Sequence, residues 1–373
     1  MNRREFISAV GTIGLAGCSM RSEHNGSASI TAPDPGWKQF RGEPQRRGYT
    51  TEDYPTDGEA VVETGIDSRS ITAPILNGRE AIFPTPDVIV GIDLQNYTEN
   101  YRVSIDRQPT LPVAFGSGVV SLVTSRSIVG YDLNEESKVW EHSAKSTYSD
   151  AAAPAALGRH FVIQDGNRLR LVEQRTGTVV WKRAFDARVD GFAADAEMLV
   201  VNRTVKGGSE LVGLNPTDGN RQWSIEIESC RFHPVIGDHI YAISEYGRLY
   251  AIDNGEVQWQ VETELLNPKS ISVSDGHLLV GPDVADEYVG VDKDEASVAW
   301  RKQIKFGNPA VVNHRQAFVP SSNAGLIRLD IATGTRLRTY SEVRFGDRLV
   351  PFAGGLLYTQ EPDERVRFLV LDE

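Results

Sequence analysis

The stretch Leu169-Arg-Leu-Val-Glu-Gln-Arg-Thr-Gly-Thr-Val-Val-Trp181 decides the fold, because the chain repeats it. It predicts a short strand, a tight turn closed by Thr176-Gly177, and a second strand that ends in Trp181. Self-similarity at intervals of roughly 40 residues, with several short strands per unit, is typical of a β-propeller. The copies place a tryptophan, or the residue that replaces it, at Tyr101, Trp140, Trp181, Trp223, Trp259, Trp300 and Arg338.

The composition is that of an acidic chain with a large apolar fraction. Its 373 residues are 40% hydrophobic, which is ample for a sizeable core. The formal net charge of −12 argues against a nucleic-acid groove, which needs a basic face. Only two cysteines occur, Cys18 and Cys230, and modification of Cys18 would leave no pair to form an intramolecular disulfide. The chain is therefore not a disulfide-stabilised secreted scaffold.

The first 17 residues are predicted to be a targeting segment. Arg3-Arg4 resembles a twin-arginine leader, and the apolar run from Ile7 to Gly17 is too short to span a bilayer. Leu15-Ala16-Gly17-Cys18 resembles a lipobox, in which the cysteine thiol takes the lipid. An ordinary cysteine in a leader cleaved elsewhere is the alternative. We expect export and a lipid anchor at Cys18 on the outer face of the cytoplasmic membrane.

The remaining chain divides into three parts. Residues 18–36 are polar and are predicted to be a flexible tether, residues 37–59 are an N-terminal extension, and residues 60–373 are the propeller. Asparagine begins an Asn-x-Ser/Thr acceptor sequence at three positions, which leaves glycosylation open at Asn25, Asn96 and Asn202.

The orphan strands at the two ends of the repeat array predict how the ring closes. Phe368–Asp372 reads as a third strand of a blade with no fourth strand after it, and Ala60–Thr64 is a strand with no blade before it. Together they complete one four-stranded antiparallel blade and hide the exposed edges. The prediction is therefore an all-β, eight-bladed propeller whose last blade is closed by an N-terminal strand, with seven blades as the alternative.

Trp37-Lys-Gln-Phe40-Arg41-Gly42, followed by Arg47-Gly48, resembles the opening of propellers of the pyrroloquinoline-quinone (PQQ)-like repeat family. The resemblance implies that the repeated tryptophan docks between neighbouring blades. Tyr101 and Arg338 depart from the pattern, so the first and seventh blades should have weaker docking contacts. Catalytic members of the family use adjacent cysteines beside PQQ and a calcium site, whereas Cys230 stands alone. We therefore expect no cofactor, with a PQQ- and calcium-dependent dehydrogenase as the alternative.

The residues that could be catalytic or metal-binding are better explained by a role in the turns and strands of the repeat. The position eight residues before the tryptophan, or six before Trp259, holds a carboxylate or amide, which suits hydrogen bonding to the following turn. Repeat-equivalent groups are spread around a ring and cannot converge on one substrate. His160, His239 and His277 follow the first turn of three blades and are expected to be exposed, so a metal role is not predicted. The sequence accordingly predicts no catalytic, cofactor-binding or metal-ligating residues.

The function expected is a non-catalytic, membrane-anchored scaffold, similar to the propeller lipoprotein of the outer-membrane β-barrel assembly machinery. The alternatives are the quinoprotein dehydrogenase and a sensor that binds a ligand in the central channel. The four strands of each blade, in chain order, are called A to D. We expect a monomer that binds another protein at the membrane surface through the face carrying the B–C and D–A loops, where variation in loop length concentrates. These are the B–C loops Asn202–Glu210, Gly281–Glu287 and Gln360–Arg367 and the D–A connections Lys145–Asp150 and Glu262–Ser270. Neutral drift of these loops is the competing explanation. The candidate contacts are Arg203, Lys206, Asp283, Asp286, Glu287 and Arg365.

Overall fold

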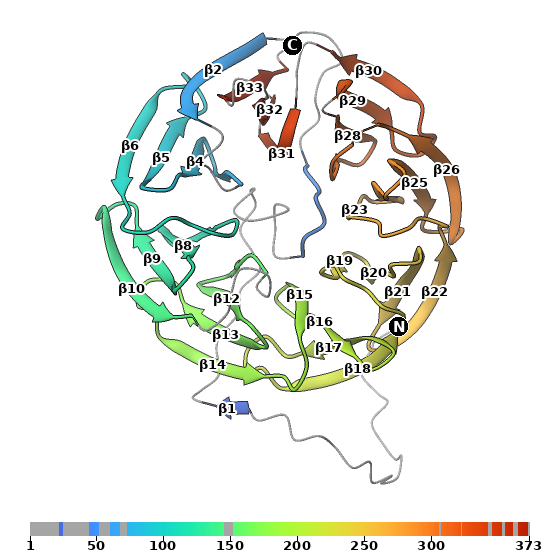
Figure 1. Ribbon diagram of the computed structural model, residues 1–373, viewed down its shortest axis with the longest axis horizontal. Helices are drawn as coiled ribbons and strands as arrows, with labels where there is room; N and C mark the ends of the chain where they lie inside the picture. Colours follow the sequence, from blue (N-terminus) through green and yellow to red (C-terminus); the bar gives the residue numbers. More distant parts are fainter. Residues whose placement is uncertain are drawn as a thin grey trace, which may run out of the picture.

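Eight antiparallel sheets surround a central axis in the computed structural model (Figure 1). The prediction of an eight-bladed, all-β propeller is confirmed, and the seven-bladed alternative is wrong. Within the part of the chain described, no helix is long and apolar enough to cross a membrane. The structure describes residues 22–24, 45–51, 60–67, 73–144, 152–305, 307–321, 323–341, 345–352, 355–360 and 365–371.

The four strands of each blade lie side by side, with the first nearest the axis and the fourth at the rim. The first four blades are formed by β3 (Ile75–Asn77), β4 (Glu80–Pro84), β5 (Val88–Asp93) and β6 (Glu99–Ser104); β7 (Ala114–Gly116), β8 (Val119–Val123), β9 (Ser127–Asp132) and β10 (Ser137–Ser143); β11 (Ala155–Leu157), β12 (His160–Asp165), β13 (Arg168–Glu173) and β14 (Val179–Ala184); and β15 (Val189–Ala194), β16 (Leu199–Val205), β17 (Gly208–Leu214) and β18 (Arg221–Ile227).

The second half of the ring repeats this order. Its blades are formed by β19 (Val235–Ile236), β20 (Ile240–Ile243), β21 (Arg248–Asp253) and β22 (Glu256–Glu262); β23 (Ile271–Val273), β24 (His277–Val280), β25 (Glu287–Asp292) and β26 (Ser297–Gln303); β27 (Val311–Val312), β28 (Gln316–Ser321), β29 (Gly325–Asp330) and β30 (Arg336–Tyr340); and β31 (Phe345–Phe352), β32 (Gly355–Gln360), β33 (Arg365–Val370) and β2 (Ala60–Asp67).

The eighth blade joins strands from opposite ends of the described chain. Strand β2 pairs antiparallel with β33, and the register sets Ala60 opposite Val370 and Val62 opposite Phe368. The sheet order is β2-β33-β32-β31, so β2 takes the outermost place that the fourth strand holds in the other blades. The contribution of this pairing to stability stays a prediction.

The hydrophobic core lies between blades rather than inside any one of them. One cluster joins Leu171 and Trp181 of the third blade to Phe192 and Leu214 of the fourth, and all four side chains are buried. This arrangement follows from the sequence pattern, because inner strands such as β8 and β9 are buried on both faces whereas outer strands such as β10 alternate. Every blade is therefore stabilised mainly by its two neighbours.

The repeated carboxylates and amides stabilise turns, as predicted. The backbone N–H of Asn134 donates to Asp132 Oδ1 at 2.8 Å, and that of Thr333 donates to Asp330 Oδ1 at 2.8 Å. In the type repeat, Glu173 Oε2 accepts from the N–H of Thr176 at 2.6 Å, and Gly177 supplies a φ of 69°. The turn function of this position is confirmed, and it leaves these carboxylates no common site.

Trp140, Trp181 and Trp300 dock as the family resemblance implies. The indole N–H donates to a backbone carbonyl in the turn of the next blade, from Trp140 to Gln174 at 2.7 Å and from Trp300 to Ile331 at 2.8 Å. Trp181 donates in the same way to the Pro216 carbonyl at 2.9 Å. These contacts link neighbouring blades at the rim of the face that carries the A–B and C–D turns.

Two described pieces of the N-terminal region contact the ring. Ser22–His24 form strand β1, which pairs with the outer edge of β14, so part of the segment expected to be a tether lies against the third blade. Residues 45–51 lie instead at the centre of the ring (Figure 1). Their backbone accepts hydrogen bonds from the innermost strands of three consecutive blades, through the N–H groups of Ile236, Val273 and Val312.

Candidate functional site

Arg203 does not lie in a flexible loop, and the prediction that it is a rim contact is wrong. The segment from Asn202 to Glu210 is an extended hairpin of β16 and β17, whose turn is Lys206–Gly207. Arg203 is 8% exposed and pairs with Glu210 and Asp186, so its charge is already neutralised inside the blade. Lys206, at the turn, is exposed as expected.

Asp283 is likewise a structural residue rather than a rim contact. It is 5% exposed, and its Oδ1 accepts from the N–H groups of Ala285 at 2.7 Å and Glu287 at 3.0 Å. Its Oδ2 accepts from the N–H of Leu266 at 3.3 Å, so Asp283 connects the loop of the sixth blade to the preceding D–A connection. Buried and fully used as an acceptor, it is unavailable to a partner.

The other candidates of this face have different outcomes. Asp286 and Glu287 are half-buried at the start of β25, where Glu287 lies 3.5 Å from Arg301. Arg365 is the first residue of β33, and its side chain lies outside the described part. The connection 145–150 and the loop 361–364 were expected to belong to this face, but they lie outside the described residues. Cys18 also lies outside the described residues.

Three exposed apolar side chains occupy this face on the fifth and sixth blades. Tyr246 lies in the B–C turn between β20 and β21, Leu266 in the connection from β22 to β23, and Val284 in the loop from β24 to β25. Their exposed fractions are 67%, 52% and 67%, in a protein whose other large apolar side chains are mostly buried. We call Tyr246, Leu266 and Val284 the apolar loop patch. Water-exposed apolar groups gathered on one face mark interaction sites.

Backbone hydrogen bonds hold the three loops of the patch together. The N–H of Val284 donates to the Leu266 carbonyl at 3.1 Å, and the N–H of Asn267 donates to the Glu245 carbonyl at 2.8 Å. The patch is therefore pre-organised, and a partner would not have to order these loops on binding.

Ion pairs surround the apolar loop patch. Arg301 Nη2 lies 3.0 Å from Glu264 Oε2, and Arg231 pairs with Glu245. The side chains of Arg231 and Glu264 are 75% and 79% exposed, so solvent screens these pairs and a partner could exchange them. An apolar centre with a charged rim is the usual anatomy of a protein interface.

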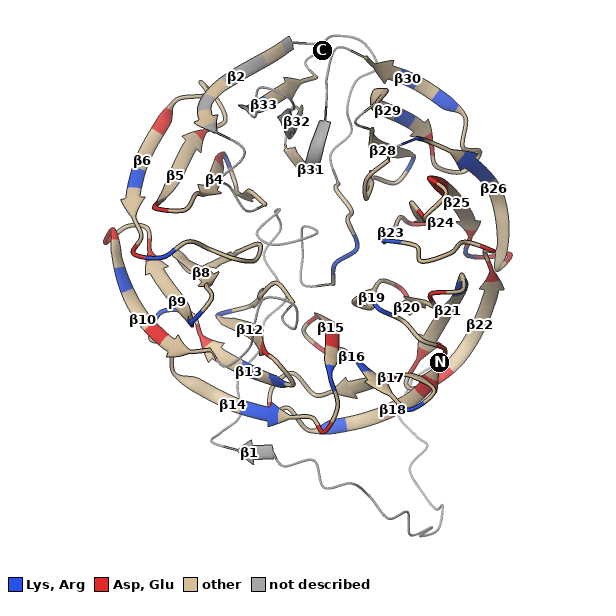
Figure 2. Cartoon of the chain, viewed as in Figure 1, with Lys and Arg blue, Asp and Glu red and all other residues tan. Residues whose placement is uncertain are grey.

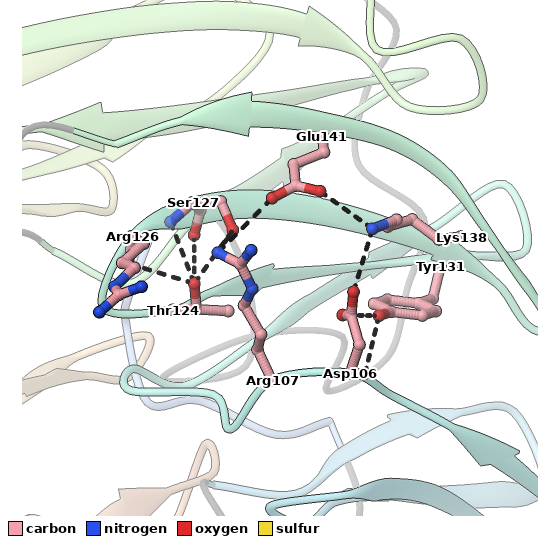
Figure 3. Close-up of polar contacts among 8 residues, drawn as sticks. All are labelled: Asp106, Arg107, Thr124, Arg126, Ser127, Tyr131, Lys138 and Glu141. Atoms are coloured by element: carbon pink, nitrogen blue, oxygen red, sulfur yellow. Dashed lines mark hydrogen bonds and ion pairs between the residues drawn. The ribbon is translucent and has the colours of Figure 1, made fainter.

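The same face of the second blade carries a different arrangement (Figure 3). Asp106, in the D–A connection, accepts hydrogen bonds from the Tyr131 hydroxyl and from Lys138 Nζ, the latter at 3.1 Å. Lys138 Nζ also lies 2.9 Å from Glu141, and Arg107 approaches Glu141 at 3.7 Å. The hydrogen bond from Tyr131 and then that from Lys138 lower the pKa of Asp106. These groups satisfy one another, so the network fixes the loop rather than offering a binding surface.

The distribution of charge agrees with this division. Figure 2 shows charged residues mainly along the outer strands and in the turns. The inner strands β8, β20 and β23 contain none, because they face neighbouring blades in the buried core. No basic surface large enough for nucleic acid follows from these charges.

The central channel is occupied by residues 45–51 beside the innermost strands. Arg46 is 1% exposed; its Nε donates to the Phe192 carbonyl at 2.6 Å and its Nη2 to the Ala153 carbonyl at 2.7 Å. The guanidinium carbon lies 4.9 Å from the centre of the Phe192 ring. The extension therefore uses backbone groups along the axis that a ligand in the channel would otherwise meet.

The residues considered for chemistry do not gather. Burial raises the pKa of the Cys230 thiol, which disfavours the reactive thiolate. His160 is 5% exposed, so the expectation that it is exposed is wrong; it begins β12 inside the third blade. Within the described ranges, no group of three or more His, Cys, Asp or Glu side chains could hold a metal ion.

Asn202 and Asn96 differ as glycosylation acceptors. Asn202 is fully buried, and its Nδ2 donates to the carbonyls of Cys230 at 2.8 Å and Phe232 at 2.9 Å, so the folded protein cannot carry a glycan there. Asn96 lies in an exposed turn, and Asn25 lies outside the described residues.

The sequence matches a known protein family over more than half of its length. The family profile described as outer membrane protein assembly factor BamB matches residues 124–270 and 245–372. The chain belongs to this family. No curated protein sequence matches the chain.

Solved structures similar to this BamB-family chain share its fold at low sequence identity. BamB from Moraxella catarrhalis is 13% identical, with 83% of this chain and 98% of that chain covered and a TM-score of 0.65. The quinohemoprotein alcohol dehydrogenase from Comamonas testosteroni is 11% identical, with 91% and 81% covered and a TM-score of 0.69. The computationally designed protein Ika8 is 12% identical, with 84% and 100% covered and a TM-score of 0.67. The fold thus occurs in BamB, in an alcohol dehydrogenase and in a designed protein, so the fold alone does not decide the function.

The apolar loop patch was not predicted from the sequence. Leu266 and Val284 lie in segments predicted to be loops, where large apolar residues are unusual, and Tyr246 lies in the turn between β20 and β21. That signal was present in the sequence. The contacts predicted from the sequence were charged residues instead, and two of them, Arg203 and Asp283, are buried.

Proposed function

We propose that the protein is a non-catalytic scaffold of the cell envelope that binds a protein partner through the apolar loop patch. The observation that carries this proposal is the exposure of Tyr246, Leu266 and Val284 together, on loops already fixed by hydrogen bonds. Membership of the BamB family supports an extracytoplasmic scaffold, since the family is described as an outer membrane protein assembly factor.

The partner that fits is a protein surface with an apolar centre and charged groups at its edge. Burying the three patch side chains would contribute most of the affinity, because a few central apolar residues usually dominate an interface. Arg231 and Glu264 would set orientation and salt dependence rather than affinity, as exposed rim charges do.

Quinoprotein catalysis is the weaker alternative. The similar alcohol dehydrogenase shares the fold alone at 11% identity. Residues 45–51 use the axial backbone groups, and the described cysteine, Cys230, is buried with a raised pKa. We infer that the protein acts without PQQ, calcium or another cofactor.

The anchor belongs to the proposal as well. Leu15-Ala16-Gly17-Cys18 supports lipidation at Cys18, and one or two acyl chains would hold the propeller at the membrane with about 0.8 kcal/mol per buried CH₂. A partner in or on that membrane would then be met at high effective concentration.

The test compares exposed apolar residues on the patch with one outside it. The partner is first captured by crosslinking the wild-type protein on native membranes. The double variant Tyr246→Ser/Leu266→Ser should bind that partner with an affinity about 30-fold lower or weaker still. Leu337→Ser is the matched control, since Leu337 is 47% exposed on the outer strand β30. Both proteins should melt like the wild type, because no core contact is removed. A double variant that captures the same partner as fully as Leu337→Ser would refute the proposal.

A further inference from the structure

The first blade departs from the docking that Trp140, Trp181 and Trp300 make in their blades. Tyr101 stands where Trp140 and Trp300 stand in their blades, but its hydroxyl donates to Glu80 Oε2 of its own blade at 3.2 Å. Trp140 and Trp300 donate instead to a carbonyl of the next blade. The weaker docking contact expected in the first blade stays a prediction.

An open pocket of about 510 Å³ lies between the first and second blades beside Tyr101. Its second-blade wall includes Leu133 and Asn134, which follow Asp132 as Gln174 and Arg175 follow Glu173 in the third blade. Gln174 is the residue whose carbonyl receives the indole of Trp140. The pocket thus includes the place that a docked indole fills elsewhere in the ring. It is lined by Asn77, Glu80, Asn100, Tyr101, Phe115, Ser117, Gly118, Leu133 and Asn134.

Glu80 gives the pocket a carboxylate where the second and third blades have none. It begins β4 after a two-residue turn, and the equivalent residues after the same turn are Val119 and His160. Burial, with the nearby charge of Asp93, raises the pKa of Glu80, while hydrogen bonds from Tyr101 and Asn100 oppose that rise. Among the described residues, no lysine or arginine pairs with Glu80.

The remaining lining is suited to a donor-rich ligand. Asn77, Asn100 and Asn134 offer amide oxygens, and the rings of Tyr101 and Phe115 offer an apolar surface for a short carbon chain. An ammonium group has three donors and no acceptor, and aromatic rings attract it. An anion would be repelled by Glu80 and Asp93, and a neutral sugar would leave the carboxylate without a counter-charge.

We propose that the pocket between the first and second blades binds a small organic cation with a primary ammonium group, held by Glu80. This site lies on the A–B/C–D face, away from the apolar loop patch, and does not depend on the scaffold proposal. Its ligand class follows from one unpaired carboxylate, three amides and an aromatic wall in the space that a tyrosine leaves open.

The experiment titrates the folded protein with 1,4-diaminobutane and ethylammonium at neutral pH, by calorimetry and ligand-observed NMR. Both amines should bind, and glucose should not. Glu80→Gln should weaken amine binding at least ten-fold. Glu135→Gln is the matched control, because Glu135 is an exposed carboxylate in the adjacent turn that does not line the pocket. It should bind as the wild type does.

A second variant tests the geometry independently of charge. Tyr101→Trp should narrow the pocket beside Glu80, remove the hydroxyl that donates to Glu80 and weaken amine binding at least ten-fold, and the protein should stay folded because tryptophan stands at this position in the next blades. Amine binding should also fall as the pH drops through the raised pKa of Glu80, because the protonated acid loses its charge. Amine binding that falls less than ten-fold in Glu80→Gln or in Tyr101→Trp, glucose binding in place of amines, or no amine binding by the wild type would each overturn the proposal.

Discussion

Replacing Arg46 by alanine should destabilise the whole ring, because this side chain joins two blades from inside the channel. Its guanidinium donates to the Phe192 carbonyl at 2.6 Å and to the Ala153 carbonyl at 2.7 Å, which belong to the fourth blade and to the segment leading into the third. The side chain is 1% exposed and lies over the Phe192 ring. Alanine would remove both bonds and leave two inner carbonyls without this donor.

The magnitude follows from the kind of bond removed. Hydrogen bonds to a charged group contribute about 1.5 to 3 kcal/mol each, so two give roughly 3 to 6 kcal/mol. Water entering the vacated space would satisfy part of the loss, so we take the lower end, about 3 kcal/mol. For roughly 300 folded residues, an unfolding entropy of about 2 cal/mol/K per residue converts this into a fall of about 5 °C in Tm.

The assay is thermal and urea unfolding of Arg46→Ala beside two further variants. Arg126→Ala removes an exposed arginine from a turn and should melt within about 1 °C of the wild type. Arg46→Lys should be intermediate, because a single ammonium cannot reproduce the planar fork of donors. If Arg46→Ala melts like Arg126→Ala, residues 45–51 do not support the ring, and the argument that they compete with a channel ligand fails with it.

Four further predictions test other parts of the molecule. Cys18→Ser should move the protein from the membrane fraction to the soluble fraction, and an unmodified mature N-terminus by intact-mass analysis would contradict the anchor. Removing residues 365–373 should expose the edges of β2 and β32 and cost several kcal/mol, so a truncated chain with an unchanged Tm would show that closure is dispensable. Tyr131→Phe should destabilise the protein near neutral pH, where Asp106 is ionised; because the folded pKa of Asp106 is lowered, the difference from wild type should shrink as the pH falls from about 4 through that value. Protein mixed with PQQ and calcium should not oxidise alcohols, and turnover above free cofactor would refute the non-catalytic assignment.

The fold was predictable because the information is repeated. The units share a strand pattern and a turn carboxylate or amide, and several share the turn glycine, so a departure in one blade can be recognised from the others. Where a unit departs, prediction fails locally: the segment from Asn202 to Glu210 looked like a long loop and is a regular hairpin. Its extra residues extend both strands in register, which length alone cannot distinguish from an irregular loop.

The candidate surface was less predictable because exposure depends on distant partners. Arg203 is buried by Glu210, seven residues away, and by Asp186, which lies before the preceding strand. Leu266 and Val284 are exposed although they are apolar. Their loops are bonded to each other through the Val284 N–H and the Leu266 carbonyl, and both side chains remain in solvent. The charge or hydrophobicity of a single residue therefore gives the wrong exposure for Arg203 as well as for Leu266 and Val284. Their exposure depends on packing between segments.

The repeat itself separates residues that maintain the ring from residues that can act. A group that recurs from blade to blade, such as the turn carboxylate or amide, is needed wherever that turn is made and cannot define one site. Tyr101 and Glu80 break the pattern together, and each contacts the other across the same blade. A lone loss of tryptophan would leave an apolar gap, whereas here the gap is faced by a carboxylate and amides that a gap does not require. Paired departures of this kind favour a ligand over drift, since drift would have to place both changes on one wall by chance.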